Sequence, residues 1–185
     1  MSRSRNRQVG AVLGAFVSVL LLSACSNSDP RDVATTLIRG ELADQIGMGD
    51  LTDATCDTPA AEEKGQTFEC SALTPEGSTI TFLAEFVEDD EIFVRTSNII
   101  TAGEMPLVES EAAEILSPEV GVEIDPADVA CPEVTSVLDE GNTLDCVITD
   151  AETGERYGLT VTFSDFDAEN GFASRNYVIG DLITE

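Results

Sequence analysis

The sequence predicts an α+β protein of two tandem repeats, each an N-terminal helix packed on a small antiparallel sheet of about four strands with one disulfide. Each half begins with apolar residues at helical spacing and continues with segments in which apolar and polar residues alternate. Each half also contains two cysteines. Residues 65–70 (GQTFEC) match residues 141–146 (GNTLDC) position by position, which indicates an internal duplication.

The beginning of the 185-residue chain has the features of a signal peptide over residues 1–24. Three arginines within the first seven residues precede an uncharged, mostly apolar stretch over residues 9–24. This order is the pattern of secretory signals, and the stretch is shorter than the roughly 20 residues of a membrane-spanning helix. Residues 22–25 (LSAC) resemble the lipobox of bacterial lipoproteins, in which the cysteine sulfur carries a diacylglyceryl group. An ordinary secretory cleavage site and a short uncleaved anchor are the alternatives.

The lipobox resemblance implies that Cys25 is the lipidation site and the first residue of the mature chain. Diacylglyceryl and palmitate chains would then hold the protein on the outer face of the plasma membrane, because two acyl chains anchor a protein far better than one. Residues 25–28 form a short tether in this interpretation. Removal of residues 1–24 leaves six basic residues against the same 36 acidic ones, so the net charge changes from −27 to −30.

The first repeat is expected over residues 29–100 and begins with a helix. An aspartate followed by a proline is typical of a helix start. The apolar spacing predicts that this helix covers residues 30–46. The segments that follow alternate between apolar and polar residues, which predicts half-buried antiparallel strands, the last of them over residues 92–100.

The second repeat is expected over residues 108–183, after a linker over residues 101–107. Its helix is predicted over residues 108–116, with Ile115 among the residues that face the sheet. Its final strand is predicted over residues 172–179. Because the linker is short, the two repeats should lie close together.

The cysteines other than Cys25 are expected to form two disulfides. Four of them remain, and an even number in an exported protein indicates disulfide pairing, for which three connectivities exist. The internal match gives each repeat one pair, so Cys56–Cys70 and Cys131–Cys146 are the expected bridges. Free thiols and metal ligands are the alternatives, although the spacing within each pair lacks the arrangement of a zinc site.

The order of motifs resembles that of the actinobacterial domain-of-unknown-function family 4333: a helix, a cysteine, a Gly-x-Thr-[Phe/Leu]-x-Cys strand, a glycine turn and a Thr/Val-rich strand. The resemblance covers most of the mature chain as two copies, over about residues 29–100 and 105–183. The second copy carries the Cys131-Pro132 pair of the family, where the first has Cys56-Asp57. The resemblance implies a small α+β domain, often exported or lipid-anchored, with no assigned activity and no catalytic residues.

Composition excludes several classes of function. A net charge of −27 opposes binding to nucleic-acid phosphates. The chain has no histidine, so it lacks an imidazole base for a Ser–His or Cys–His pair and an imidazole ligand for zinc. We therefore expect no catalytic residues, no cofactor, no metal and no nucleic-acid partner. The acidic clusters over residues 88–91 and 165–169 are expected to be solvated turns, with calcium binding as the alternative.

Four residues are candidates for an interaction face. Arg95 and Arg175 occupy matching places near the ends of the last strands, where pairing with neighbouring acids is the expected role and ligand contact the alternative. Tyr157 and Tyr177 belong to a residue type enriched in interfaces, but packing is the usual role in alternating strands.

The function expected from these observations is that of a membrane-anchored envelope lipoprotein: a non-enzymatic recognition or scaffold module. Its partners would be the membrane, through the lipid on Cys25, and an unidentified envelope protein or ligand. One alternative is an inhibitor of a secreted enzyme, because the architecture is similar to that of the secreted β-lactamase-inhibitory proteins, which are tandem repeats with one disulfide each. The other alternative is a carboxylate-dependent hydrolase.

Overall fold

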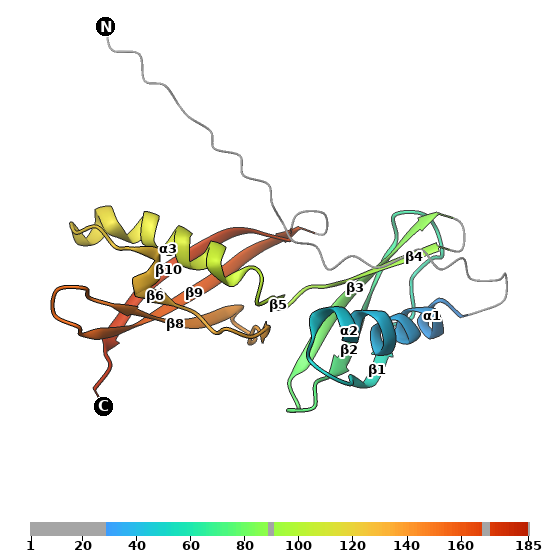
Figure 1. Ribbon diagram of the computed structural model, residues 1–185. Helices are drawn as coiled ribbons and strands as arrows, with labels where there is room; N and C mark the ends of the chain where they lie inside the picture. The colour runs from blue at the N-terminus through green and yellow to red at the C-terminus, as the bar shows by residue number, and fades with distance from the viewer. Residues whose placement is uncertain (1–28, 89–90, 168–170, 185) are drawn as a thin grey trace, which may run out of the picture.

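The computed structural model describes residues 29–88, 91–167 and 171–184. The predicted signal peptide, Cys25 and the tether lie outside these residues, as do parts of both acidic turns. The described chain is an α+β structure in which each half contains a helical segment and an antiparallel sheet. The two halves lie side by side and are joined by a short two-stranded sheet (Figure 1). No helix among the described residues has both the length and the apolar character needed to cross a membrane.

The first helical segment covers residues 30–46, as the apolar spacing predicts. It consists of α1 (Pro30–Leu37), η1 (Ile38–Leu42), which is a π-helical turn, and α2 (Ala43–Ile46). Gly47 follows with a φ of 68°. This left-handed conformation is accessible to glycine at little cost, and it ends the helix.

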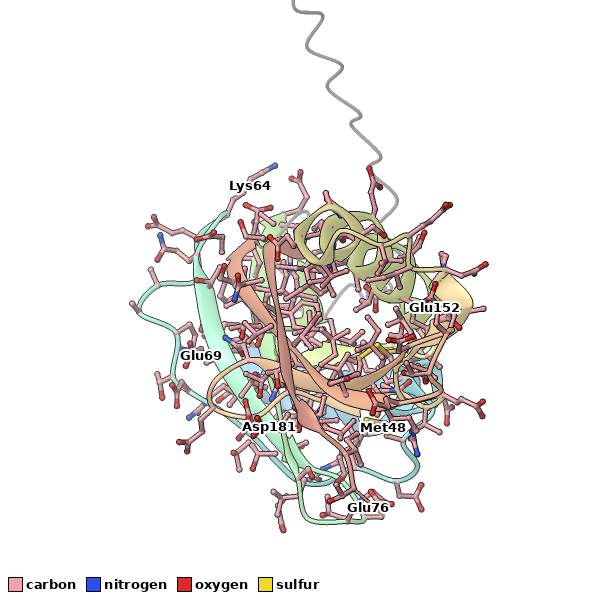
Figure 2. All side chains as sticks on the ribbon, turned by 90° about the vertical axis from the view of Figure 1, so that its left-hand side faces the viewer. Met48, Lys64, Glu69, Glu76, Glu152 and Asp181 are labelled. Atoms are coloured by element: carbon pink, nitrogen blue, oxygen red, sulfur yellow. A yellow bond between two sulfur atoms is a disulfide. The ribbon has the colours of Figure 1, made fainter. Side chains whose placement is uncertain are left out.

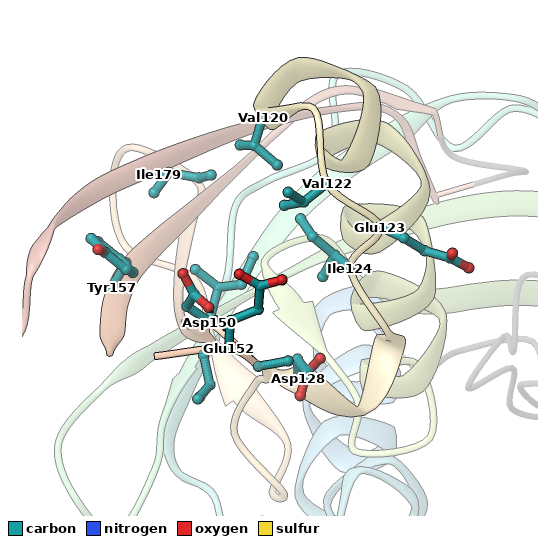
Figure 3. Close-up of a pocket in the computed structure, with 12 residues that line it drawn as sticks. Val120, Val122, Glu123, Ile124, Asp128, Asp150, Glu152, Tyr157 and Ile179 are labelled. Carbon is teal, nitrogen blue, oxygen red and sulfur yellow. Dashed lines mark hydrogen bonds between the residues drawn. The ribbon is translucent and has the colours of Figure 1, made fainter. Parts of the chain in front are cut away.

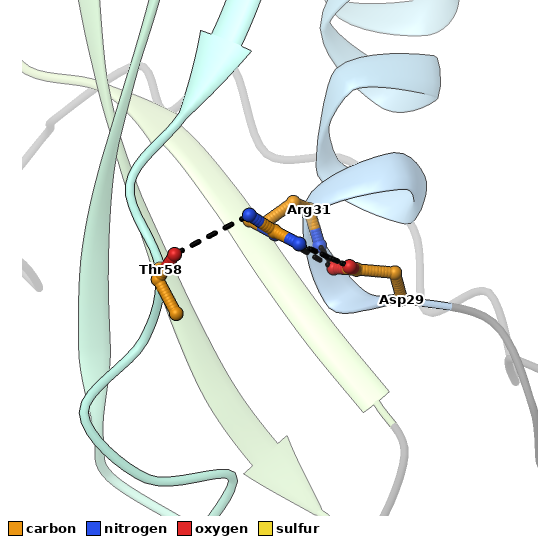
Figure 4. A network of polar contacts seen from close by, with 3 residues as sticks. All are labelled: Asp29, Arg31 and Thr58. Carbon is orange, nitrogen blue, oxygen red and sulfur yellow. Dashed lines mark hydrogen bonds and ion pairs between the residues drawn. The ribbon is translucent and has the colours of Figure 1, made fainter.

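The start of α1 is fixed by its N-cap. The Asp29 carboxylate accepts a hydrogen bond from the backbone N–H of Arg31 at 2.9 Å and forms an ion pair with the Arg31 guanidinium. Arg31 also donates to Thr58 Oγ1 at 3.3 Å, which connects the helix start to the loop beyond Cys56 (Figure 4). The hydrogen bonds from Arg31 lower the pKa of Asp29 to about 2, so this carboxylate is ionised at neutral pH.

The first sheet is an antiparallel meander in which each strand pairs with the next one along the chain. Across the sheet, its strands are β1 (Thr52–Cys56), β2 (Thr67–Leu73), β3 (Thr79–Glu88) and β4 (Glu91–Thr96). Alternate residues of β2 and β3 are buried, as predicted, and α1 contacts both edge strands. The core of this half includes Leu37, Ile38, Leu42, Phe68, Ile80, Phe82, Phe86 and Val94.

The strand predicted over residues 92–100 is interrupted, which corrects the prediction. A separate strand, β5 (Ile99–Ile100), begins after Asn98. The Asn98 side chain accepts a hydrogen bond from the backbone N–H of Thr81 at 2.8 Å and donates to the carbonyl of Thr79 at 3.0 Å. Because this amide satisfies backbone groups of β3 that a longer β4 would have paired, the chain leaves the sheet at this point.

The second half begins with α3 (Met105–Val120), which extends beyond the predicted residues 108–116 at both ends. The helix starts earlier because Pro106 fits a first helical turn, where backbone N–H groups have no partner within the helix. It continues past Pro118 because this proline falls in the last turn and interrupts little of the helix. Gly121, with a φ of 77°, then ends it.

The prediction that Ile115 faces the sheet is wrong. Its side chain is 38% exposed. The buried residues of α3 are Met105, Val108, Ala112, Ala113 and Leu116. The buried stripe is centred on the side of the two alanines, so Ile115 lies at its edge.

The second sheet is also an antiparallel meander. Its strands are β6 (Val129–Ala130), which follows a short 3₁₀ turn, η2 (Pro126–Asp128), then β8 (Thr143–Thr149), β9 (Arg156–Asp167) and β10 (Gly171–Leu182). The predicted last strand is therefore present and longer than expected. α3 contacts the two edge strands, β6 and β10. The core of this half includes Val108, Leu116, Val129, Leu144, Leu159, Val161, Phe163 and Tyr177.

The two-stranded sheet connects the halves directly. β5 pairs antiparallel with β7 (Ser136–Val137), and the backbone N–H of Leu138 donates to the carbonyl of Asn98 at 2.8 Å. Ile99 packs into the core of the first half, whereas Ile100 packs into that of the second. Consecutive residues of one strand therefore belong to the two different cores.

Both predicted disulfides are present, as Cys56–Cys70 and Cys131–Cys146. Cys56 lies directly opposite Cys70 in the ladder between β1 and β2, with 4.0 Å between their Cα atoms. Cys131 follows β6 and bonds to Cys146 in β8, with 4.3 Å between their Cα atoms. Each disulfide therefore joins the first two strands of its meander.

Replacement of Cys56 and Cys70 together by alanine is expected to destabilise the protein. The disulfide joins residues 14 positions apart, and a loop of this length is worth about 3 kcal/mol in the chain-entropy account. Urea unfolding followed by circular dichroism measures the loss, with the Cys131→Ala/Cys146→Ala variant as the matched comparison. A loss below about 1 kcal/mol in both variants would contradict this account.

Candidate functional site

A pocket is present in the second half, beside the end of α3. Figure 1 shows this end of α3 on the side of the second half that points away from the first half. It is formed by the end of α3, the loop that follows, the turn between β8 and β9, and a residue of β10. We call it the α3 pocket. Its volume is about 720 Å³, which is within the range of pockets that bind small organic molecules.

Apolar side chains form much of the wall of the α3 pocket. They are Val120, Val122, Ile124, Ile148, Tyr157 and Ile179. Ile148 is buried, whereas Val120 and Val122 are 46% and 60% exposed. The helix ends at Gly121, so the chain turns there and places a valine on each side of the glycine next to the pocket. The pocket therefore presents aliphatic surface that the described chain leaves accessible to solvent.

Acidic side chains stand beside this aliphatic surface. Glu123, Asp128, Asp150 and Glu152 line the α3 pocket, and no lysine or arginine among the residues that the structure describes does so. The carboxylates of Asp150 and Glu152 extend from the β8–β9 turn toward the aliphatic side chains on the opposite wall, whereas that of Glu123 points away from them (Figure 3). The pocket thus combines an apolar wall with negative charge on one side.

Asp150 is held in place by the turn that it begins. Its carboxylate accepts hydrogen bonds from the backbone N–H groups of Thr153 at 3.1 Å and of Glu152 at 2.8 Å. These two bonds lower the pKa of Asp150 below its ordinary value. The side chain is therefore ionised at neutral pH, and its position is determined by the backbone of the turn.

Tyr157, one of the candidate interaction residues, lines the α3 pocket. Its ring is half-buried against the core of the second half, and its hydroxyl donates to Glu155 Oε2 at 2.8 Å. This hydrogen bond to a carboxylate raises the pKa of Tyr157. The residue therefore contributes both to the core and to the pocket wall.

Arg175 and Tyr177 lie between β10 and α3. Arg175 Nη1 is 2.6 Å from Glu111 Oε2 on the helix, and its guanidinium lies over the ring of Phe163 at 5.8 Å from the ring centre. Tyr177 is buried, and its hydroxyl has no hydrogen-bond partner among the described residues. Burial raises the pKa of Tyr177. Both side chains make internal contacts, and their role in an interaction face stays a prediction.

Arg95 has a similar environment in the first half. Its Nη2 atom is 2.6 Å from Glu85 Oε2 on the neighbouring strand, and its guanidinium lies 4.7 Å from the ring centre of Phe93. The pairing with acids that the sequence suggested is therefore present for Arg95 as well as for Arg175. Neither arginine lines the α3 pocket.

The other predicted residues lie away from the pocket. Cys25 is outside the described residues, so its lipidation stays a prediction. In the first acidic turn, Glu88 Oε1 accepts a hydrogen bond from Lys64 Nζ at 2.8 Å. Residues 89–90 of this turn and residues 168–170 of the second acidic turn lie outside the described residues. Within the described ranges, no group of three or more cysteine or acidic side chains is placed to hold a metal ion.

Acidic side chains also project from other parts of the surface. Glu69, Glu76 and Asp181 are exposed and lie on the outside of the molecule (Figure 2). The ion pairs found in the described part of the chain involve Arg31, Lys64, Arg95 and Arg175, and none of these cations lines the α3 pocket. The acids of the α3 pocket share its lining with exposed aliphatic side chains, Val120 and Val122 among them.

No protein-family model, curated protein or solved structure matches the chain. The resemblance to family 4333 therefore stays a prediction based on the motifs.

The α3 pocket was not identified from the sequence. Of its lining residues, only Tyr157 had been selected as a candidate, and for its residue type alone. The one local signal is Val120-Gly121-Val122, in which two aliphatic residues flank a glycine that ends a helix. Their exposure depends on how the β8–β9 turn packs against the loop after α3, which no local pattern specifies.

The lowered pKa of Asp150 predicts a pH-dependent contribution to stability. A carboxyl group whose pKa is lower in the folded chain stabilises the fold above its unfolded-state pKa, and this contribution is lost as the pH falls through the folded-state value. The difference in free energy of unfolding between the unmodified chain and its Asp150→Asn variant should therefore be largest near pH 6 and decrease below about pH 4.

Urea unfolding over a series of pH values tests this difference. The Glu140→Gln variant, which removes an exposed charge outside the β8–β9 turn, is the control for the loss of one negative charge. A difference for Asp150→Asn that stays constant from about pH 6 to about pH 2.5 would show that the turn does not depend on the ionised carboxylate.

Proposed function

We propose that the chain is an exported, lipid-anchored lipoprotein whose second half recognises a ligand through the α3 pocket without catalysing a reaction. The observation that carries the recognition role is the exposure of Val120 and Val122 at the mouth of a pocket that also holds ionised Asp150. Exposed aliphatic side chains around a concave surface with a few polar groups are typical of ligand-binding sites.

The anchoring part of the proposal is supported by the beginning of the sequence. A basic segment, an apolar stretch and the LSAC motif over residues 22–25 form the pattern of a lipoprotein signal peptide. Diacylglyceryl and palmitate groups on Cys25 would place the protein on the outer face of the plasma membrane. In the described chain, α1 starts at the opposite end from the α3 pocket (Figure 1). This arrangement suits a recognition site held away from its anchor.

We further propose that the two halves are tandem repeats of one α+β unit. The matching motifs over residues 65–70 and 141–146 support this, and each half has a helical segment followed by a four-stranded antiparallel meander. In each half a disulfide joins the first two strands of the meander. The first repeat would then act as the scaffold between anchor and pocket.

Asp150 does not suit the general-acid role that the carboxylate-dependent hydrolase considered above requires. A hydrolytic general acid must be protonated near neutral pH, which requires a raised pKa. Asp150 has a lowered pKa because the N–H groups of its own turn stabilise its charge. The inhibitor alternative has no specific structural observation in its favour beyond the paired α+β architecture.

The anchoring proposal predicts that the Cys25→Ala variant loses its membrane attachment. Without the sulfur there is no site for the diacylglyceryl group, so the protein should move from the membrane fraction to the soluble or secreted fraction. Cell fractionation with immunoblotting measures this. Equal membrane retention of the variant and the unmodified chain would exclude lipidation at Cys25 as the anchor.

The recognition proposal predicts that cross-linking depends on position. A photoreactive amino acid at position 122, within the pocket, should give specific adducts in intact cells, detected by mass spectrometry. The matched control is position 134, where Val134 is 67% exposed but does not line the pocket. Absence of adducts at position 122, or the same adducts at both positions, would contradict a ligand site at the α3 pocket.

A further inference from the structure

The composition of the α3 pocket indicates which class of ligand it binds, and this inference rests on the proposed recognition role of the pocket. The volume of about 720 Å³ suits one small organic molecule. The aliphatic wall suits an apolar body, because such a body would cover surface of Val120 and Val122 that is now in contact with water.

The charge of the pocket restricts the ligand further. Asp128, Asp150 and Glu152 line it, and no cationic side chain in the described part of the chain does, so the described lining residues supply no counter-charge. Asp150 and Glu152 are exposed, so their attraction for a cation acts through water and depends on the salt concentration. An anionic amphiphile would be repelled, whereas a neutral one would leave the charges without a partner.

We infer that the ligand of the α3 pocket is a small organic cation with an aliphatic body, whose ammonium or guanidinium group lies between the carboxylates of Asp150 and Glu152. The aliphatic body lies against Val120, Val122 and Ile148. Asp150 is already oriented by hydrogen bonds from the backbone of its turn, so its ionised carboxylate is in place to accept a hydrogen bond from the cation. Glu152, from the same turn, approaches the same space (Figure 3).

The size of the pocket favours such a small molecule over a basic protein segment. A docked segment normally requires an extended groove or a free strand edge that receives several consecutive residues. The α3 pocket is a single concavity closed on one side by buried Ile148 and bordered by the β8–β9 turn.

Three probes of equal length test the inference: hexylammonium, 1-hexanol and hexanoate. The full lipid-anchored chain is reconstituted in phosphatidylcholine nanodiscs, with valine and isoleucine methyl groups labelled for NMR, and the free probe concentration is measured by dialysis. Hexylammonium should shift the methyl signals of Val120, Val122 and Ile148 but not those of Val134, and should bind at least tenfold more tightly than 1-hexanol. Hexanoate should cause no shift.

Two variants separate the charge from the aliphatic surface. Asp128→Asn/Glu152→Gln should weaken hexylammonium binding about tenfold and change 1-hexanol binding less than twofold, because only the cation interacts with the carboxylates. Val122→Lys should weaken hexylammonium binding by a similar factor, since it places a positive charge at the mouth of the pocket. The control variant Val134→Lys should bind all three probes as the unmodified chain does. Raising the salt from 20 mM to 500 mM should reduce the preference for the cation.

Equal affinity for hexylammonium and hexanoate, or a lack of methyl shifts in the pocket with millimolar hexylammonium, would overturn the inference. Methyl shifts caused by a basic peptide but not by hexylammonium would overturn it as well. If adducts still form at position 122 in cells, the recognition role of the pocket stands and only the ligand class is wrong. If both experiments fail, the pocket is not a ligand site.

Discussion

The register of the first strand pair in each sheet is the constraint on which the rest of the fold depends. In both halves a disulfide fixes this register. In the first half the two cysteines are directly opposite each other in the ladder. Because side chains alternate between the two faces of a strand, a slip of one residue would move Phe68 and Ala72 from the core to solvent. The helices α1 and α3 have an apolar face to cover only when this register holds. Each core is small, so a covalent constraint contributes a large share of its stability.

Features that follow from local periodicity could be predicted from the sequence. The first helix, the alternating rows of the strands and the two cysteine pairs are of this kind. Features that depend on a distant partner could not: the Asn98 amide ends β4 by bonding to the backbone of β3. The face of α3 was misjudged at Ile115 because the buried stripe is centred on Ala112 and Ala113, which leaves Ile115 at its edge. The α3 pocket combines segments that are far apart in the sequence, so only Tyr157 among its residues was anticipated.

The acidic composition opposes nucleic-acid binding, and in the α3 pocket it supports the proposed binding of a cation. Most acidic residues are surrounded by water, which screens their charge and gives them little individual effect. Asp150 and Glu152 are exposed too, but they line a pocket together with exposed aliphatic side chains, and under the inference above charge and apolar contact would act there on the same ligand. The remaining negative charge has a different effect under the proposed anchoring. It repels an anionic membrane surface and leaves attachment to the lipid.

The ladder between β5 and β7 couples the two halves of the molecule mechanically. A bend at this point would break backbone hydrogen bonds and draw Ile99 or Ile100 out of its core. A change in the angle between the halves is therefore coupled to the packing of both cores. Under the proposed anchoring at Cys25, the connection between the halves would limit how far the α3 pocket moves relative to α1. Loss of either core would remove a strand partner from the other, so thermal melting of the halves should be cooperative.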